Sequence, residues 1–335
     1  MRTIPFVTAL LLPLTAMAQD RGPILDDVTQ SHILPRFAQL AEATQQLKAA
    51  AEAECAADAP GLRDAYHAAF DDWISASHLR FGPTETGDRA FAIAFWPDTK
   101  GFTPKALSQL IAADTGLDDP DAFAQTSIAG RGFFALEQML YDPAFAATGE
   151  AEQRCAVIRA ITTDINRNAD AIAEDWQSYA LVLTQPGADS PYRSDEEALQ
   201  ELFKALSAGL QFTSETRLGR PLGTFDRPRP NRAEARRSGR ALRHVELSLV
   251  ALRDLAARLS VDHPDIATSL DAGFNKAITR AQKLEDPVLA GVATPQGRLR
   301  VEALQQEIND LRAIVATELG PTLGISAGFN SLDGD

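Results

Sequence analysis

Residues 156–183 read AVIRAITTDINRNADAIAEDWQSYALVL, and the spacing of the apolar side chains in this region identifies the fold class. The large apolar residues recur at helical intervals along one stripe, formed by Cys155, Ile158, Ile161, Ile165, Ile172 and Trp176. The pattern predicts one long amphipathic helix over residues 150–183, with its apolar stripe turned toward a core.

The same periodicity extends through the rest of the chain, and strand-like alternation is almost absent. Further helices are expected over residues 33–55, 62–79, 104–113, 132–141, 195–213, 233–259, 264–284 and 296–319. Pro35 cannot donate a hydrogen bond to the carbonyl of Ser31, so the first of these helices should bend or begin close to His32. We therefore predict an all-α fold of two packed helical bundles with a cleft between them.

The segment Gln-Pro-Gly-Ala-Asp-Ser, residues 185–190, is the expected boundary between the bundles. It divides an N-terminal bundle, residues 19–185, from a C-terminal bundle, residues 186–335. A connector rich in proline and arginine, residues 219–230, cannot be regular helix.

The first residues have the pattern of an export signal. Arg2 supplies a short positive region, and the apolar run that follows it to Met17 is too short to span a membrane. Ala16-Met17-Ala18 matches the small-x-small pattern of a signal peptidase site. We expect residues 1–18 to be removed after Ala18, the mature protein to be periplasmic, and no membrane span to remain. The alternative is a tethering helix that stays in place.

The chain is acidic, with 32 Lys+Arg against 46 Asp+Glu and a formal net charge of −14. Such a surface repels phosphate backbones, which argues against nucleic acid as a partner. It is compatible with cation binding, although most acidic proteins use this charge for solubility.

The chain has two cysteines, Cys55 and Cys155. In an exported protein an even pair predicts a disulfide, and two cysteines alone cannot supply the four ligands of a structural zinc site.

One carboxylate stands out because it falls on an apolar helix face. Within residues 132–141, Glu137 shares a face with Phe134, Leu140 and Tyr141. A buried carboxylate needs an arginine, backbone donors or a cation as its partner. We expect an arginine, either Arg80 or Arg240. The alternative is a cation held jointly with His32 or Asp98.

Several short motifs, taken in order, resemble the imelysin family of bacterial periplasmic and surface proteins, also called M75 peptidase-like or iron-regulated protein A-like. The resemblance covers most of the mature chain. Its motifs are His32-Ile33-Leu34-Pro35, Arg80-Phe81-Gly82-Pro83, Phe95-Trp96-Pro97-Asp98, Gly132-Phe133-Phe134-Ala135-Leu136-Glu137, Arg237-Ser238-Gly239-Arg240 and the C-terminal residues 328–335.

The sequence departs from the family's hallmark motif, Gly-x-His-x-x-Glu. Gly132 and Glu137 match the motif, but Phe134 stands at the histidine position. A His and a Glu three residues apart lie on one helix face and could share a metal ion, whereas phenylalanine cannot ligate one. The departure therefore disfavours peptidase activity.

The expected ligand site lines the cleft and consists of Arg80, Trp96, Asp98, Glu137, Arg237, Ser238 and Arg240. Arginine suits an anionic ligand because its planar fork pairs bidentately with carboxylates, but the same arginines could instead neutralise Glu137 and Asp98. Asp98 could also cap a turn or a helix. Ser238-Gly239, expected within a helix, suggests the close approach of another backbone.

A metal site is the second expectation. His32 and His78 each lie beside a family-like motif, and with Glu137 they are the candidate ligands for iron or another divalent metal. A histidine at a helix end is more often a cap or a surface residue. His67 and His263 are expected to be solvated, and His244 is assigned no role.

The resemblance implies a role in iron or haem acquisition as a binding component. The implied partners are a metal, haem or a small anionic ligand, and an uptake protein in the inner or outer membrane. The alternatives are a metal-dependent peptidase of the M75 type and a partner-binding scaffold without a small ligand.

Overall fold

The computed structural model of the chain describes residues 21–113, 116–146 and 148–325. Within these ranges the backbone forms helices joined by turns and no strand, which confirms the all-α prediction. The expected signal segment, residues 1–18, and the C-terminal motif, residues 328–335, lie outside the described residues.

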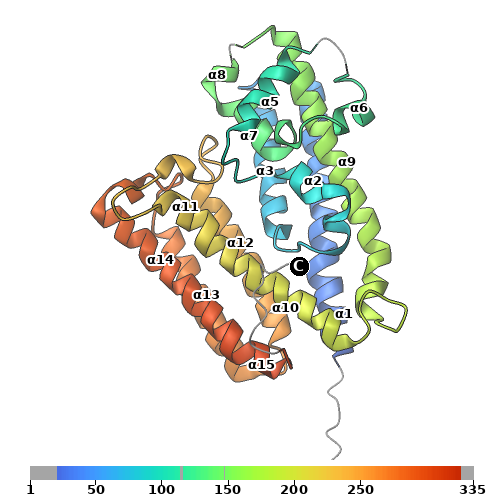
Figure 1. Ribbon diagram of the computed structural model, residues 1–335, viewed down its shortest axis with the longest axis vertical. Coiled ribbons are helices and arrows are strands. Elements are labelled where there is room, and N and C mark those ends of the chain that lie inside the picture. Colours follow the sequence, from blue (N-terminus) through green and yellow to red (C-terminus); the bar gives the residue numbers. More distant parts are fainter. Residues whose placement is uncertain (1–20, 114–115, 147, 326–335) are drawn as a thin grey trace, which may run out of the picture.

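The first bundle is built on three long helices, α2 (Leu34–Ala53), α3 (Pro60–Ala76) and α9 (Ala151–Thr184). Helix α2 packs along both α3 and α9. The predicted stripe of α9 is buried from Ile158 to Trp176, and the Trp176 ring stacks on Phe37 with a centroid distance of 5.6 Å. Four short helices gather at one end of this bundle (Figure 1): α5 (Phe102–Ile111), α6 (Pro120–Ala124), α7 (Gly132–Tyr141) and α8 (Pro143–Ala146). Helix α4 (Arg89–Ile93) packs against α9 and α7.

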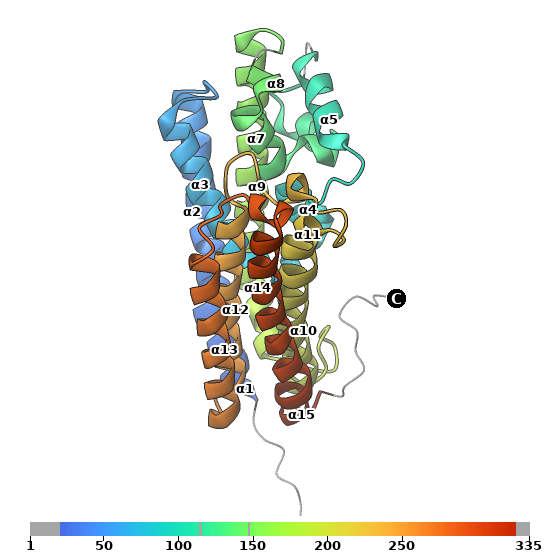
Figure 2. The same ribbon diagram turned by 90° about the vertical axis from the view of Figure 1, so that its left-hand side faces the viewer.

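The second bundle contains α10 (Asp195–Gln211), α12 (Ala241–Leu259), α13 (Pro264–Gln282) and α14 (Pro295–Ile314), with the short helices α11 (Gly219–Leu222) and α15 (Gly320–Thr322). It lies beside the first bundle, and α12 packs against α3 (Figures 1 and 2). The division of the chain at residues 185–190 stays a prediction.

The chain is already helical before Pro35. Helix α1 (Gly22–Val28) runs through a π-helical segment, η1 (Thr29–Ile33), directly into α2. The N–H of Leu34 donates to the carbonyl of Thr29, five residues back, which is the hydrogen bond of a π-turn. This wider turn lets the helix continue through Pro35, which has no N–H to donate. The helix therefore does not begin near His32, because the chain is helical on both sides of it. The alternative expectation, a bend at this place, stays a prediction.

Helix α12 begins at Ala241, so the expected start at residue 233 is also wrong. Gly239 has a φ of 73°, in the left-handed region that favours glycine and cannot continue an α-helix. Residues 235–240 form a turn, and Ser238-Gly239 is part of this turn and not of a helix.

The predicted disulfide between Cys55 and Cys155 is present, with the two Cα atoms 5.2 Å apart. It joins the residues that follow α2 to the first turns of α9. Over the part of the chain that the structure describes, no helix is both long and apolar enough to cross a membrane.

Candidate functional site

A cavity of about 440 Å³ opens where the two bundles meet. We call it the aromatic cavity, because its walls include the rings of Trp73, Phe81, Phe91, Trp96, Phe134 and Phe212. The first five rings come from the first bundle, and Phe212 follows α10 of the second.

Trp96 holds a continuous aromatic wall together. Its ring stacks on Phe134 at a centroid distance of 6.0 Å and meets Phe212 edge-on at 5.9 Å. Phe134 also meets Phe70 edge-on at 5.2 Å. Such contacts fix the rings in place, so the wall is preformed.

The arginines that reach this cavity are already paired. Arg217 lies 2.7 Å from Glu234, and both side chains are about 95% buried. Arg80 pairs with Glu85 and lies over the Phe91 ring. Both arginines are therefore neutralised by carboxylates of the protein.

A second pocket, of about 230 Å³, adjoins the first. Its walls include Arg220, Arg232, Arg236 and Arg237, and we call it the arginine pocket. Trp96 and Phe134 line both cavities. The structure thus brings Trp96, Asp98, Glu137 and Arg237 of the predicted site into one pocket, while Arg80 lines the aromatic cavity.

Glu137 is buried and is held by Ser238. Its Oε1 accepts hydrogen bonds from the backbone N–H and the side-chain hydroxyl of Ser238, both at 2.8 Å. Burial raises the pKa of Glu137, and the hydrogen bonds from Ser238 oppose that rise. The turn at residues 235–240 directs these donors at the carboxylate, which a continuous helix could not do.

The expectation that Arg80 or Arg240 pairs with Glu137 is wrong. Arg240 pairs with Asp71 and contacts His67 Nδ1 at 2.7 Å, and Arg80 is occupied by Glu85. Partly buried carboxylates, Asp71 and Glu85, pair with these arginines, whereas the Glu137 carboxylate accepts hydrogen bonds from the neutral donors of Ser238.

Asp98 acts as a cap at the start of α5. Its carboxylate accepts from the backbone N–H groups of Lys100, Phe102 and Thr103 at 2.8–3.3 Å. Burial by itself would raise the pKa of Asp98, but these hydrogen bonds outweigh burial and hold the pKa below its ordinary value. The structure thus favours the capping alternative for this residue.

His32 and His78 meet in a buried chain of hydrogen bonds. His32 Nδ1 lies 2.7 Å from an Asp254 oxygen, and its Nε2 lies 2.8 Å from His78 Nε2. Burial lowers the pKa of His32 to about 4 and that of His78 well below its ordinary value, so both rings are neutral at pH 7. A neutral His32 that donates to Asp254 must accept from His78, which fixes the tautomers of both rings.

Side chains of this chain do not form a site for a bare metal ion within the described residues. No group of three or more His, Cys, Asp or Glu side chains there is placed to hold one. His32 and His78 are brought together, but Glu137 does not join them. The Glu137 carboxylate is committed to Ser238, and Phe134 offers no ligand atom.

Of the remaining histidines, His67 differs from expectation. His67 is half-buried and lies 2.8 Å from the Tyr141 hydroxyl, and so is not a solvated residue. His244 is fully buried 3.2 Å from Glu234. Sequence reasoning also missed Arg220, Arg232, Arg236 and Gln138; the proline- and arginine-rich connector was the available signal for the first of these.

The chain matches the family model described as imelysin over residues 33–315. Iron-regulated protein A of Synechococcus elongatus is 25% identical to it over 301 residues, which cover 82% of this chain and 79% of that protein.

Two solved structures share the fold. The crystal structure of an imelysin-like protein from Psychrobacter arcticum gives a TM-score of 0.77 at 21% identity and covers 92% of this chain and 97% of that chain. That of a putative iron-regulated protein A precursor from Parabacteroides distasonis gives a TM-score of 0.71 at 13% identity, with 91% and 97% covered. With the family model matching most of the sequence, this chain belongs to the imelysin family.

Proposed function

We propose that this protein binds an iron-bearing organic complex, of which haem is one example, and serves iron acquisition as a binding component and not as a catalyst. The names of two similar proteins, iron-regulated protein A of Synechococcus elongatus and a putative iron-regulated protein A precursor of Parabacteroides distasonis, support the link to iron. The same proposal places the protein in the periplasm, where it would hand its ligand to an uptake protein of the inner or outer membrane.

The observation that carries the proposal is the wall of Trp96 and Phe134, which an apolar cavity and an arginine-lined pocket share. A volume of about 440 Å³ lies within the range of organic ligand sites. Stacked and edge-on rings favour a planar or aromatic ligand body. An amphipathic anion would place its apolar part among these rings and its charged groups near the arginines.

Iron is proposed to arrive already complexed because the described residues offer no group of three or more side chains placed to hold a bare ion. Phe134 replaces the motif histidine, and Glu137 is held by Ser238. A complexed iron needs apolar contact and charge complementarity more than a set of protein donors. The same two observations weigh against a metal-dependent peptidase, which needs a metal-activated water.

Titration of the purified mature protein with haemin, followed by its visible absorption and by tryptophan fluorescence, tests the proposal. We expect saturable binding with one equivalent, and Trp96→Ala should weaken it about tenfold or more, because the central ring of the wall is lost. Phe225→Ala is the matched control, since that ring is 81% exposed and lines neither cavity.

Added ferric ion without an organic ligand should bind weakly by comparison. The proposal fails if haemin and other ferric chelates show no saturable binding, or if Trp96→Ala binds haemin as tightly as the wild type does. Tight binding of the bare ion with no binding of complexes would also overturn it.

A further inference from the structure

The arginine pocket gathers cations from one connecting region of an acidic protein. Arg220 lies in α11, Arg232 ends the short η6 helix (Pro230–Arg232), and Arg236 and Arg237 belong to the turn before α12. The chain as a whole has a formal net charge of −14. The positive charge of this pocket is therefore opposite in sign to the net charge of the chain.

Most of this charge has no counterion among the residues that the structure describes. Arg237 donates to Asp142 at 2.6 Å, but Arg220, Arg232 and Arg236 make no side-chain hydrogen bond and no ion pair within 4.0 Å to any residue that the structure describes. The guanidinium of Arg220 lies over the Trp96 ring, 5.6 Å from its centroid, and its Nε is buried without a partner.

The two carboxylates in the wall form no ion pair within 4.0 Å with these three arginines. Asp98 is saturated by backbone N–H groups, and Glu137 accepts from Ser238. Burial, and then the nearby Arg232, lower the pKa of Arg220, as expected for cations that lack a counterion.

A buried amide in the same wall also lacks a partner. Gln138 is only 7% exposed, it lines the pocket, and its Oε1 has no hydrogen-bond partner among the described residues. Since the oxygen and nitrogen of an amide are interchangeable by a flip, Gln138 can present N–H donors to an anion in the pocket. A buried polar group left unpaired is costly, which indicates that something else satisfies it.

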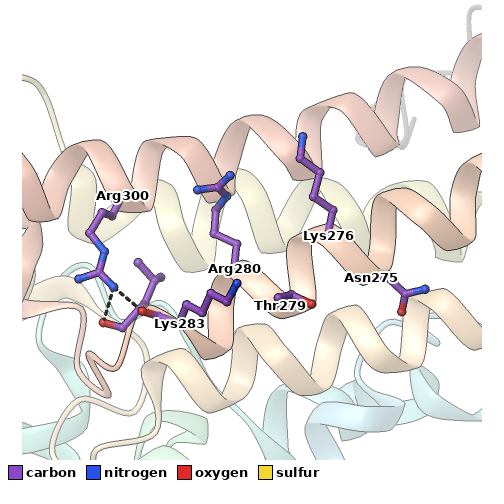
Figure 3. A pocket seen from close by; sticks show the side chains of 7 residues that line it. Asn275, Lys276, Thr279, Arg280, Lys283 and Arg300 are labelled. Atoms are coloured by element: carbon purple, nitrogen blue, oxygen red, sulfur yellow. Dashed lines mark hydrogen bonds between the residues drawn. The ribbon is translucent and has the colours of Figure 1, made fainter.

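A basic groove on the second bundle provides the contrast. Its wall contains Lys276, Arg280, Lys283 and Arg300 (Figure 3). Here the charges serve the fold: Arg280 lies 2.6 Å and Lys276 3.4 Å from Glu307, and Arg300 donates to the backbone carbonyls of Lys283 and Leu284. Lys276, Arg280 and Arg300 of the groove are therefore paired within the described chain. Arg220, Arg232 and Arg236 of the arginine pocket are not.

We propose that the arginine pocket is a binding site for a small oxyanion, a carboxylate or a phosphate. Guanidinium groups pair bidentately with either group, and the pocket volume of about 230 Å³ suits one small anion with its remaining water. Arg232 and Arg236 supply the pairing, Gln138 adds a donor, and Arg220 is held in place over Trp96. This site does not depend on the proposed iron complex, because it needs only the anion.

Isothermal titration of the purified protein with succinate and, separately, with inorganic phosphate tests this site at a fixed ionic strength set by chloride. We expect saturable binding of at least one of the two anions, and the comparison between them tells a carboxylate site from a phosphate site. Arg232→Gln and Arg236→Gln should each weaken binding about tenfold or more, because a charge-assisted hydrogen bond is lost.

Lys283→Gln is the matched control, because it removes the same charge from the basic groove and should leave anion affinity unchanged. Arg232 is an exposed residue, so its variant should unfold at the wild-type temperature. Absence of saturable binding for both anions overturns the proposal, as does equal weakening by Lys283→Gln. Haemin binding by the same variants is measured in a separate titration. A failure to bind haemin would therefore leave the result for succinate and phosphate unaffected.

Discussion

Replacement of Glu137 by glutamine should leave the protein at least as stable as the wild type at neutral pH. Glutamine keeps an oxygen that can accept from the N–H and hydroxyl of Ser238, which now bond to the carboxylate at 2.8 Å. It removes a charge that burial disfavours. No buried arginine is left unpaired by the change, since Arg80 and Arg240 have other partners.

Glu137→Ala should be less stable than Glu137→Gln. Both variants lack the charge, so their difference isolates the hydrogen bonds of Ser238 and the lost side-chain packing. A stranded donor costs about 1–3 kcal/mol, and each methylene removed from the interior costs roughly 0.8 kcal/mol. A buried ion pair with one partner removed would instead cost about 3–5 kcal/mol in both variants.

The pH dependence has a definite sign. Burial raises the pKa of Glu137 above its ordinary value of 4.5, so the folded state keeps the proton to higher pH than the unfolded chain does. The unfolding free energy of the wild type therefore falls as pH rises through this interval. Glutamine does not titrate, so its advantage over the wild type should be small below pH 4.5 and grow above it.

Urea unfolding of the wild type and both variants across this pH range measures these differences, with a chelator and with added iron or zinc. The reasoning is refuted if Glu137→Gln is as destabilising as Glu137→Ala, because the charge itself would then be needed. A metal-dependent rise in melting temperature that the glutamine variant lacks would likewise refute it and establish a metal site despite Phe134.

Three further outcomes are expected. Thiol titration of denatured, unreduced protein should find no free sulfhydryl from Cys55 or Cys155, and reduction should cost about 4–5 kcal/mol in the chain-entropy model for a loop of this length. Purified protein should not cleave casein with or without zinc or iron; chelator-sensitive cleavage that Glu137→Gln abolishes would contradict this. Because burial lowers the pKa of His32 to about 4, with the half-buried His67 shifted in the same direction, stability should fall as pH drops from 6.5 to 4, by about 3 kcal/mol for His32 alone. A His32→Gln variant with an unchanged slope in urea unfolding would exclude His32 as a source.

The features that the sequence predicted well depend on residues a few positions apart. The apolar stripe of α9 repeats every three or four residues, and the helix spans Ala151–Thr184 against an expected 150–183. The capping alternative for Asp98 is of the same kind, because its partners lie two to five residues away. Such interactions are encoded locally and can be identified without a tertiary model.

The features that the sequence did not predict depend on contacts between residues far apart in the chain. Ser238 and Glu137 are separated by 101 residues, and their contact needs Gly239 to adopt a left-handed conformation that ends any helix there. The interpretation of Gly239 as a point of close approach within a helix does not predict this turn. The arginines around the pocket converge only because α11, η6 and this turn fold back onto the Trp96 loop.

Phe134 shows why the loss of a motif histidine need not leave an empty site. A histidine there would place polar nitrogens in a wall that is otherwise apolar, and each would need a ligand or a hydrogen-bond partner. The phenylalanine ring needs neither, is 7% exposed, and stacks on Trp96 while it meets Phe70 edge-on. The same position that could have held half of a metal site therefore completes the surface shared by the aromatic cavity and the arginine pocket. This exchange fits a ligand recognised by stacking and charge better than one recognised by coordination.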